Sequence, residues 1–304
     1  MLSQLVVLPV VSAATDIPVS LSVSAGHRMD NLNWSIAGNT INVLSELKWE
    51  GLAIAQLQLA GELQLKNDRR LRARLGSGTI VSGTNQDSDY NGNNRTQEYS
   101  RSNNKAGGDV FDASIGIGKT LRMRDMGAGR SVHVTPFVGL SLHQQNLTMT
   151  DGVQTISLAP STSPLGPFPG LASSYDAQWM GPWLGAEARV ETEQGWAMMA
   201  YAEYHLVEYS AKANWNLRTE PVTGFAHPVS FMHTATGQGI VLSLGAAYPV
   251  GKSWKINFTL DHRQWTTRAG SDRVYFADGT VGYARLNAVN WDSTAYNVGI
   301  VRQF

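Results

Sequence analysis

Apolar and polar side chains alternate along the chain from Val43 to Leu65. The odd positions are mostly apolar, and the even positions are mostly polar. This period of two is typical of a β-strand, whose successive side chains point to opposite faces, whereas a helix repeats every ~3.6 residues. The pattern predicts a long strand whose odd-numbered residues, including Leu47, Leu57 and Leu59, face outward.

The same alternation returns along the rest of the chain, as in Phe111–Ile117, Ile240–Tyr248 and Trp254–Leu260. It defines ten segments, with boundaries uncertain by a few residues. The predicted strands are 17–29, 41–66, 70–87, 107–122, 131–150, 177–191, 196–216, 238–250, 253–268 and 288–304. An even number of long antiparallel strands favours a closed up-and-down barrel, because closure leaves no unpaired edge.

The connections between the predicted strands alternate in length. Those near 66–69, 124–130, 193–195 and 251–253 are short, and the others are long and rich in Gly, Ser, Asn, Pro and Thr. Long loops therefore gather at one end and turns at the other, as in outer-membrane barrels with long extracellular loops. The fold class expected is all-β, a ten-stranded antiparallel transmembrane β-barrel. A soluble barrel or sandwich is the alternative, although it would bury faces that here look exposed to lipid.

The amino-acid composition limits the kinds of partner and site that the chain is expected to have. Lys plus Arg equals Asp plus Glu at 24 each, so charge gives no reason to expect a nucleic-acid partner. The absence of cysteine removes disulfides, thiolate metal sites and a cysteine nucleophile. The apolar start, with small residues at Ser12–Ala14, predicts a signal peptide over residues 1–14. A positive first region is missing, which is typical of a truncated signal peptide. A buried first strand is the alternative. Residues 15–304 would then form the barrel.

Several segments resemble the omptins, outer-membrane endopeptidases built as ten-stranded barrels. "INVLSELKWEGLAI" is similar to their second strand, "SGTNQDSDYN" to the end of their third and "MGPWLGAEARV" to their sixth. The most specific element is Asp87-Ser88-Asp89. In omptins an Asp pair faces an Asp-x-His pair across the barrel mouth. The resemblance implies that Asp87 and Asp89 are catalytic residues that help to hold and activate a water.

The second half of that site is missing. The resemblance places the Asp-x-His pair at Asn214 and Asn216, and asparagine cannot act as a base near neutral pH. His205, two residues after Glu203, lies roughly 35 Å below the rim at ~3.3 Å per residue and is expected in an interior polar pair. His227 and His233, on a long loop, are the candidates for a recruited base.

Other interpretations of the chemistry stay open. His143 fits a lumen or rim residue. "DSDYNGNN" offers oxygen ligands for calcium but lacks a final bidentate acid, and it can equally be a solvated loop. A porin is a third possibility. It is weakened because charges expected in the lumen can pair and plug it, namely Glu46, Lys48, Glu50, Glu62, Lys255, Asp261 and Arg263.

The sequence thus predicts an omptin-like barrel of the bacterial outer membrane, with its long loops facing outside. It keeps the Asp pair but lacks the Asp-x-His pair, which favours a non-proteolytic role in surface adhesion, binding or envelope structure. The alternative is an aspartyl-type endopeptidase with a different base. We expect no cofactor, and the omptin resemblance implies lipopolysaccharide as the candidate activating lipid. The expected partners are outer-membrane lipid and peptides or host surface proteins.

Overall fold

Ten long strands form a closed ring in the computed structural model, which describes residues 18–125, 130–158, 162–221 and 224–304. The predicted signal peptide lies outside the described residues. The long strands are β1 (Val19–Ala37), β2 (Ser45–Gln64), β3 (Arg69–Tyr90), β4 (Glu98–Lys119), β6 (Arg130–Ser157), β8 (Ser173–Thr192), β9 (Ala197–Asn214), β10 (Phe231–Pro249), β11 (Trp254–Thr267) and β13 (Val281–Gln303). The short elements are β5 (Leu121–Asp125), β7 (Gly166–Pro167), β12 (Gly270–Tyr275) and a 3-10 turn, η1 (Asn93–Arg95).

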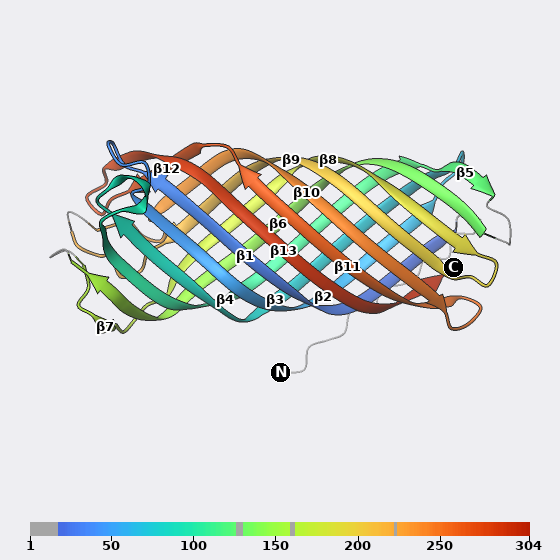
Figure 1. The fold of residues 1–304 in the computed structure, drawn as a ribbon, viewed down its shortest axis with the longest axis horizontal. Coiled ribbons are helices and arrows are strands. Elements are labelled where there is room, and N and C mark those ends of the chain that lie inside the picture. Colours follow the sequence, from blue (N-terminus) through green and yellow to red (C-terminus); the bar gives the residue numbers. More distant parts are fainter. Residues whose placement is uncertain (1–17, 126–129, 159–161, 222–223) are drawn as a thin grey trace.

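Each long strand pairs antiparallel with the next, and β13 pairs with β1 to close the ring. The tilted strands make an elongated barrel, with the turns and the C-terminus at one end and β7 and β12 at the other (Figure 1). The prediction of a ten-stranded barrel with alternating loops and turns is therefore confirmed. Within the described residues, no helix is long and apolar enough to cross a membrane.

An apolar belt covers the outer wall nearer to the turns. It consists of exposed side chains on the long strands: Leu21, Val23, Leu57, Leu59, Leu75, Val81, Ile115, Val138, Leu140, Leu184, Leu206, Leu242, Leu244, Ile256, Phe258, Val298 and Ile300. Toward the loop end the outward side chains become polar and pair with one another, as in Gln144 to Gln178 (3.1 Å) and Asn31 to Asp292 (2.9 Å). The strands continue beyond this border, so the mouth of the barrel stands clear of the belt.

A β-bulge in β2 corrects the predicted orientation of that strand. Gly51 has φ +59°, and the pairing with both neighbouring strands shifts register here. An extra residue in one strand exchanges its two faces. Leu57 is 62% exposed as predicted, whereas Leu47 is 1% exposed and packs inside the barrel, so its predicted outward position is wrong.

The same bulge changes which charges enter the lumen. Glu62, Lys255, Asp261 and Arg263 face inward as expected. Glu46, Lys48 and Glu50 lie on the other side of the bulge and share the face opposite Leu47. Glu46 is covered there by ion pairs with Arg95 and Lys48.

Charged groups fill the middle of the lumen. Arg28 is fully buried; it donates two hydrogen bonds to Asp30 (2.7 and 2.5 Å) and one to Asp112 (2.8 Å). Asp112 also accepts bonds from Arg263 (2.9 Å) and His143 (2.7 Å). We call this set the mid-barrel network. Toward the mouth a layer of buried aromatic rings covers it: Trp34, Trp49, Tyr175, Trp179, Tyr209, Trp265 and Trp291.

Candidate functional site

The Asp pair lies on the inner face of the barrel mouth. The pairing of β3 with β4 shifts register between Ile80 and Thr84, which moves the odd-numbered residues beyond this point to the inside. Asp87 stands opposite Leu47 in β2, and Leu47 belongs to the interior cluster. Asp87 lies six positions past Val81, the last exposed apolar residue of β3. The pair is therefore above the apolar belt.

Groups from three segments surround the two carboxylates. The Trp215 side chain, just after β9, lies near Asp87 and favours its charged form, and the Arg218 guanidinium attracts both acids. Ser45 and Ser100 pair with Asp89 from the strands flanking β3, and their side chains favour its charged form. Arg218 is exposed and lies 4.9 Å above the Phe225 ring.

Burial and mutual repulsion favour the protonated forms of the pair. Burial raises the pKa of Asp87 well above its usual value, and the neighbouring Asp89 charge raises it further, while Trp215 and Arg218 oppose the shift. Burial also raises the pKa of Asp89, against the hydrogen bond from Ser45 and the charge of Arg218. Two close carboxylates of this kind hold a proton more readily than one.

The two asparagines at the predicted partner positions bond elsewhere. The Asn214 side-chain oxygen lies 2.8 Å from His227 Nδ1. Asn216 accepts bonds from the Ala172 amide (2.9 Å) and the Ser173 hydroxyl (3.0 Å), so it fastens the segment before β8. The odd-numbered residues of β9 face inward, and this places Ala213 and Trp215 on the lumen side. Within the described residues, neither asparagine contacts the Asp pair.

The candidate histidines are dispersed. His227 is exposed and bonded to Asn214. His233 is fully buried between Tyr175 (2.8 Å) and Asp272 (3.4 Å). His205 pairs with Glu203 deep in the lumen (3.3 Å), as expected, and His143 belongs to the mid-barrel network. None of them is among the groups that contact or charge-couple to Asp87 or Asp89 in the part of the chain that the structure describes.

Trp215 and Arg218 are the residues that the sequence interpretation missed. The alternation along β9 could have located Trp215. The odd positions, such as Glu203, His205 and Tyr209, face the lumen, and the even positions, such as Glu208 and Lys212, face outward. Extending that alternation by one position points Trp215 at the lumen. For Arg218 the sequence holds no such signal, because it lies in a loop. In the described ranges no cluster of three or more His, Asp or Glu side chains has the geometry to hold a metal ion.

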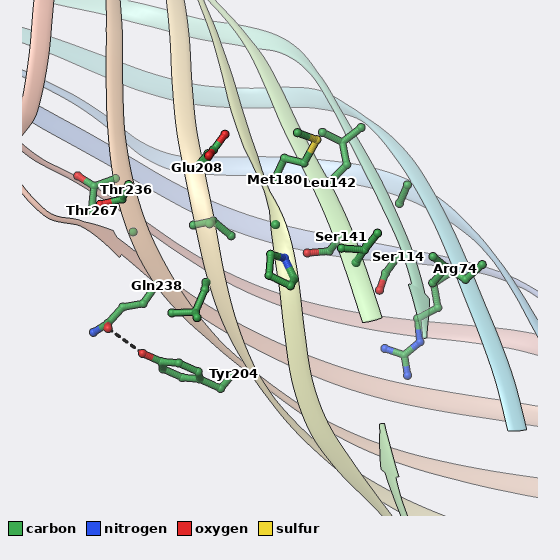
Figure 2. Close-up of a pocket in the computed structure, with 18 of the residues that line it drawn as sticks. Arg74, Ser114, Ser141, Leu142, Met180, Tyr204, Glu208, Thr236, Gln238 and Thr267 are labelled. Atoms are coloured by element: carbon green, nitrogen blue, oxygen red, sulfur yellow. Dashed lines mark hydrogen bonds between the residues drawn. The ribbon is translucent and has the colours of Figure 1, made fainter. Parts of the chain in front are cut away.

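A groove of about 1140 Å³ crosses the outer wall at the border of the apolar belt. Its lining is mainly apolar, with Leu75, Leu140 and Met180, and becomes polar at Glu208 and Gln238. Figure 2 shows the Tyr204 hydroxyl donating to the Gln238 side-chain oxygen (2.9 Å), with Met180 and Leu142 on neighbouring strands. This surface combines an apolar floor with polar edges.

A closed antiparallel ring with an apolar outer belt and a polar mouth defines an outer-membrane β-barrel. Residues 22–304 match the family described as Protochlamydia outer membrane protein, and the chain belongs to that family. Its place is the bacterial outer membrane. No curated protein sequence matches the chain.

Two solved structures can be compared with the chain. The outer membrane protease OmpT from Escherichia coli matches with a TM-score of 0.68 and 15% identity, over 94% of this chain and 97% of that chain. The translocator domain of the autotransporter NalP from Neisseria meningitidis matches with a TM-score of 0.38 and 14% identity, over 93% and 88% of the two chains. The first likeness confirms the omptin-like fold predicted from the sequence, and at this identity it shows the fold alone.

Proposed function

We propose that this protein is a non-proteolytic outer-membrane barrel whose mouth binds a partner at the cell surface. The observation that carries the proposal is the set of groups around Asp87: in the part of the chain that the structure describes, Trp215 and Arg218 act on this carboxylate, and no histidine does. An indole N–H and a guanidinium are donors that do not accept a proton at neutral pH. They hold the acids without supplying a general base for water attack.

The mouth offers more negative than positive charge to a partner. Asp87, Asp89 and Glu98 lie close together, and Glu98 is paired with Arg101. The positive charge of Arg218 lowers the pKa values of both aspartates, so a single cation partly compensates two acids. A cationic side chain of a peptide or surface protein would complete the compensation and lower the pKa values of the pair. With the long loops outside, such a partner would approach from the medium.

Contact with lipid is part of the proposal. The outer groove, with its apolar floor at Leu140 and Met180 and its polar edge at Gln238, supports binding of membrane lipid, including lipopolysaccharide. No cofactor has a role in this function.

A second function is favoured by the Asp pair itself. Two partly buried carboxylates with raised pKa values hold a proton that can be passed to a substrate, which is the basis of aspartyl-type peptide hydrolysis. An endopeptidase of this kind would use Asp87 and Asp89 together, with the exposed His227 as the candidate for a recruited base.

Peptide binding tests the surface role. A fluorescent peptide with paired basic residues is added to purified, lipopolysaccharide-supplemented barrel, and anisotropy reports binding. We expect the Asp87→Asn, Asp89→Asn double variant to bind about tenfold or more weakly, because it loses charge-assisted hydrogen bonds. Asp109→Asn, on the outer wall, is the matched control and should bind as wild type. Equal affinity of all three proteins would refute binding at the Asp pair.

A further inference from the structure

The lumen holds a cavity on the turn side of the mid-barrel network. We call it the turn-end pocket. Its volume is about 510 Å³, and strands on both sides of the closure between β1 and β13 contribute to its wall. Its polar lining includes Arg72, Arg74, Tyr201, Lys255, Asn257 and Asp261, and the C-terminal Gln303 and Phe304 lie at its rim. At its inner end Arg74 and Asp261 also line a cavity of about 50 Å³ next to Asp112 and Arg263.

Arginines elsewhere in the lumen are matched by carboxylates. Arg28 is held by Asp30 and Asp112, and Arg70 binds Glu62 (2.6 Å) and Glu187 (2.6 Å). This is the expected arrangement, because a buried cation without a partner is costly. The turn-end pocket departs from this arrangement, because some of its cationic side chains lack a carboxylate partner among the described residues.

Three cationic side chains of the turn-end pocket have donors to spare. Arg72 binds Glu203 through Nη2, but its buried Nη1 has no hydrogen-bond partner among the residues that the structure describes. Arg74 makes no ion pair within the described ranges; its guanidinium lies 4.8 Å from the Tyr201 ring, and that of Arg72 lies 4.6 Å from the same ring. Lys255, across the pocket on β11, likewise has no ion pair among the described residues.

The acids near these groups are bound to other side chains or make no ion pair within the described ranges. Glu62 and Glu191 also line the pocket, but they pair with Arg70 and Arg189. Glu203 is shared between Arg72 and His205, and Asp261 accepts a hydrogen bond from Ser243 (2.5 Å) but makes no ion pair among the described residues. Arg72 and Arg74, two positions apart on one face of β3, place like charges side by side. An oxyanion between them would receive N–H donors from both, and charge-assisted bonds of this type are among the stronger ones in proteins.

We propose that the turn-end pocket binds the oxyanion group, carboxylate or phosphate, of a small molecule entering from the turn end, with Arg74, Arg72 Nη1 and Lys255 as its donors. The site is separate from the Asp pair, because the mid-barrel network and the aromatic layer lie between them. The same chemistry fits a free metabolite or a lipid headgroup.

Protection of an introduced cysteine tests the site. The chain has no cysteine, so Ser22→Cys places a single thiol on the pocket wall. The folded barrel is labelled with a charged thiol reagent in the presence of inorganic phosphate, succinate or dihexanoyl phosphatidylglycerol, with sodium chloride at matched ionic strength as the reference. We expect saturable protection by at least one probe. Protection by phosphate or succinate indicates a free anion, and protection by the lipid alone indicates a headgroup.

The variants decide whether the proposed donors are responsible. Arg74→Gln in the Ser22→Cys background should raise the half-protecting concentration about 10- to 100-fold. Lys105→Gln, on the exposed loop-end part of β4, is the matched control and should leave that concentration unchanged. If Arg74→Gln fails to show the heat-dependent gel shift of a folded barrel, Lys255→Gln at the pocket entrance replaces it, with the same direction expected. No protection beyond sodium chloride, or equal protection in wild-type and variant pockets, would overturn the proposal.

Discussion

Replacing Asp112 should destabilise the barrel more than replacing any exposed acid of the same strand. This carboxylate accepts hydrogen bonds from Arg28 (2.8 Å), Arg263 (2.9 Å) and His143 (2.7 Å). Asp112→Ala removes all three acceptor contacts at once. Asp112→Asn keeps the shape of the side chain and one acceptor oxygen, but it removes the charge.

The size of the loss in folding free energy depends on the Arg28 charge, which stays buried when Asp112 is removed. Arg28 is fully buried, and it keeps Asp30 as its only carboxylate partner in the described structure when Asp112 is lost. Breaking a buried ion pair by removing one partner costs about 3–5 kcal/mol, because an uncompensated charge stays buried. We therefore expect a loss of about 3–5 kcal/mol for Asp112→Ala and a smaller loss for Asp112→Asn. Asp109→Ala, three positions away on β4 and bonded to Asn146 on the outer wall, should cost less than about 1 kcal/mol.

Urea unfolding of the barrel in phospholipid vesicles measures these differences. Tryptophan fluorescence is a suitable signal, because two tryptophans lie next to the mid-barrel network. The ring centroids of Trp265 and Trp291 are 4.9 and 5.7 Å from that of His143. Wild type and the three variants are compared at one pH and one lipid composition. Equal free energies of unfolding for Asp112→Ala and Asp109→Ala would show that the mid-barrel network does not hold the barrel together.

Further predictions concern the wall and the mouth. Lipid-soluble thiol reagents should label cysteines placed at Leu57 and Leu59 but not at Leu47; labelling at Leu47 would refute the bulge at Gly51. Leu57→Arg should cost about 2–4 kcal/mol near the bilayer midplane, measured by urea unfolding. Because folding raises the pKa values of Asp87 and Asp89, wild type should lose stability as the pH rises from about 4, the unfolded value, through the folded pKa values. Asp87→Asn should reduce that loss, and an unchanged pH dependence would contradict the raised values.

The sequence predicts the barrel well because one physical constraint repeats along the chain. In lipid, every backbone group must be paired, so long strands with one apolar face must close into a ring. All ten predicted segments overlap a long strand of the structure. The ends were less predictable: β4 begins at Glu98, whereas the alternation starts at 107, because above the belt the outer face of a strand is as polar as its inner face.

The candidate site was less predictable, because the register of the strands decides which side chains face the lumen. Asp87 faces the lumen only because of the irregularity between Ile80 and Thr84, and Leu47 turns inward only because of the bulge at Gly51. A shift of one residue exchanges all the side chains of a strand between its two faces. The catalytic assignment of Asp87 and Asp89 remains a prediction carried by the omptin resemblance, and so does the choice between binding and proteolysis.

Peptide cleavage by the unmodified protein tests the central claim most directly. Purified wild-type barrel, supplemented with lipopolysaccharide, is incubated at neutral pH with peptides that include paired basic residues, and mass spectrometry follows the products over time. Among the described residues no histidine acts on the Asp pair, and a positioned general base typically contributes ~10²–10⁴ in rate. We therefore predict that wild type and Asp87→Ala yield the same background. Cleavage by wild type that Asp87→Ala abolishes would contradict the account and identify the protein as a peptidase.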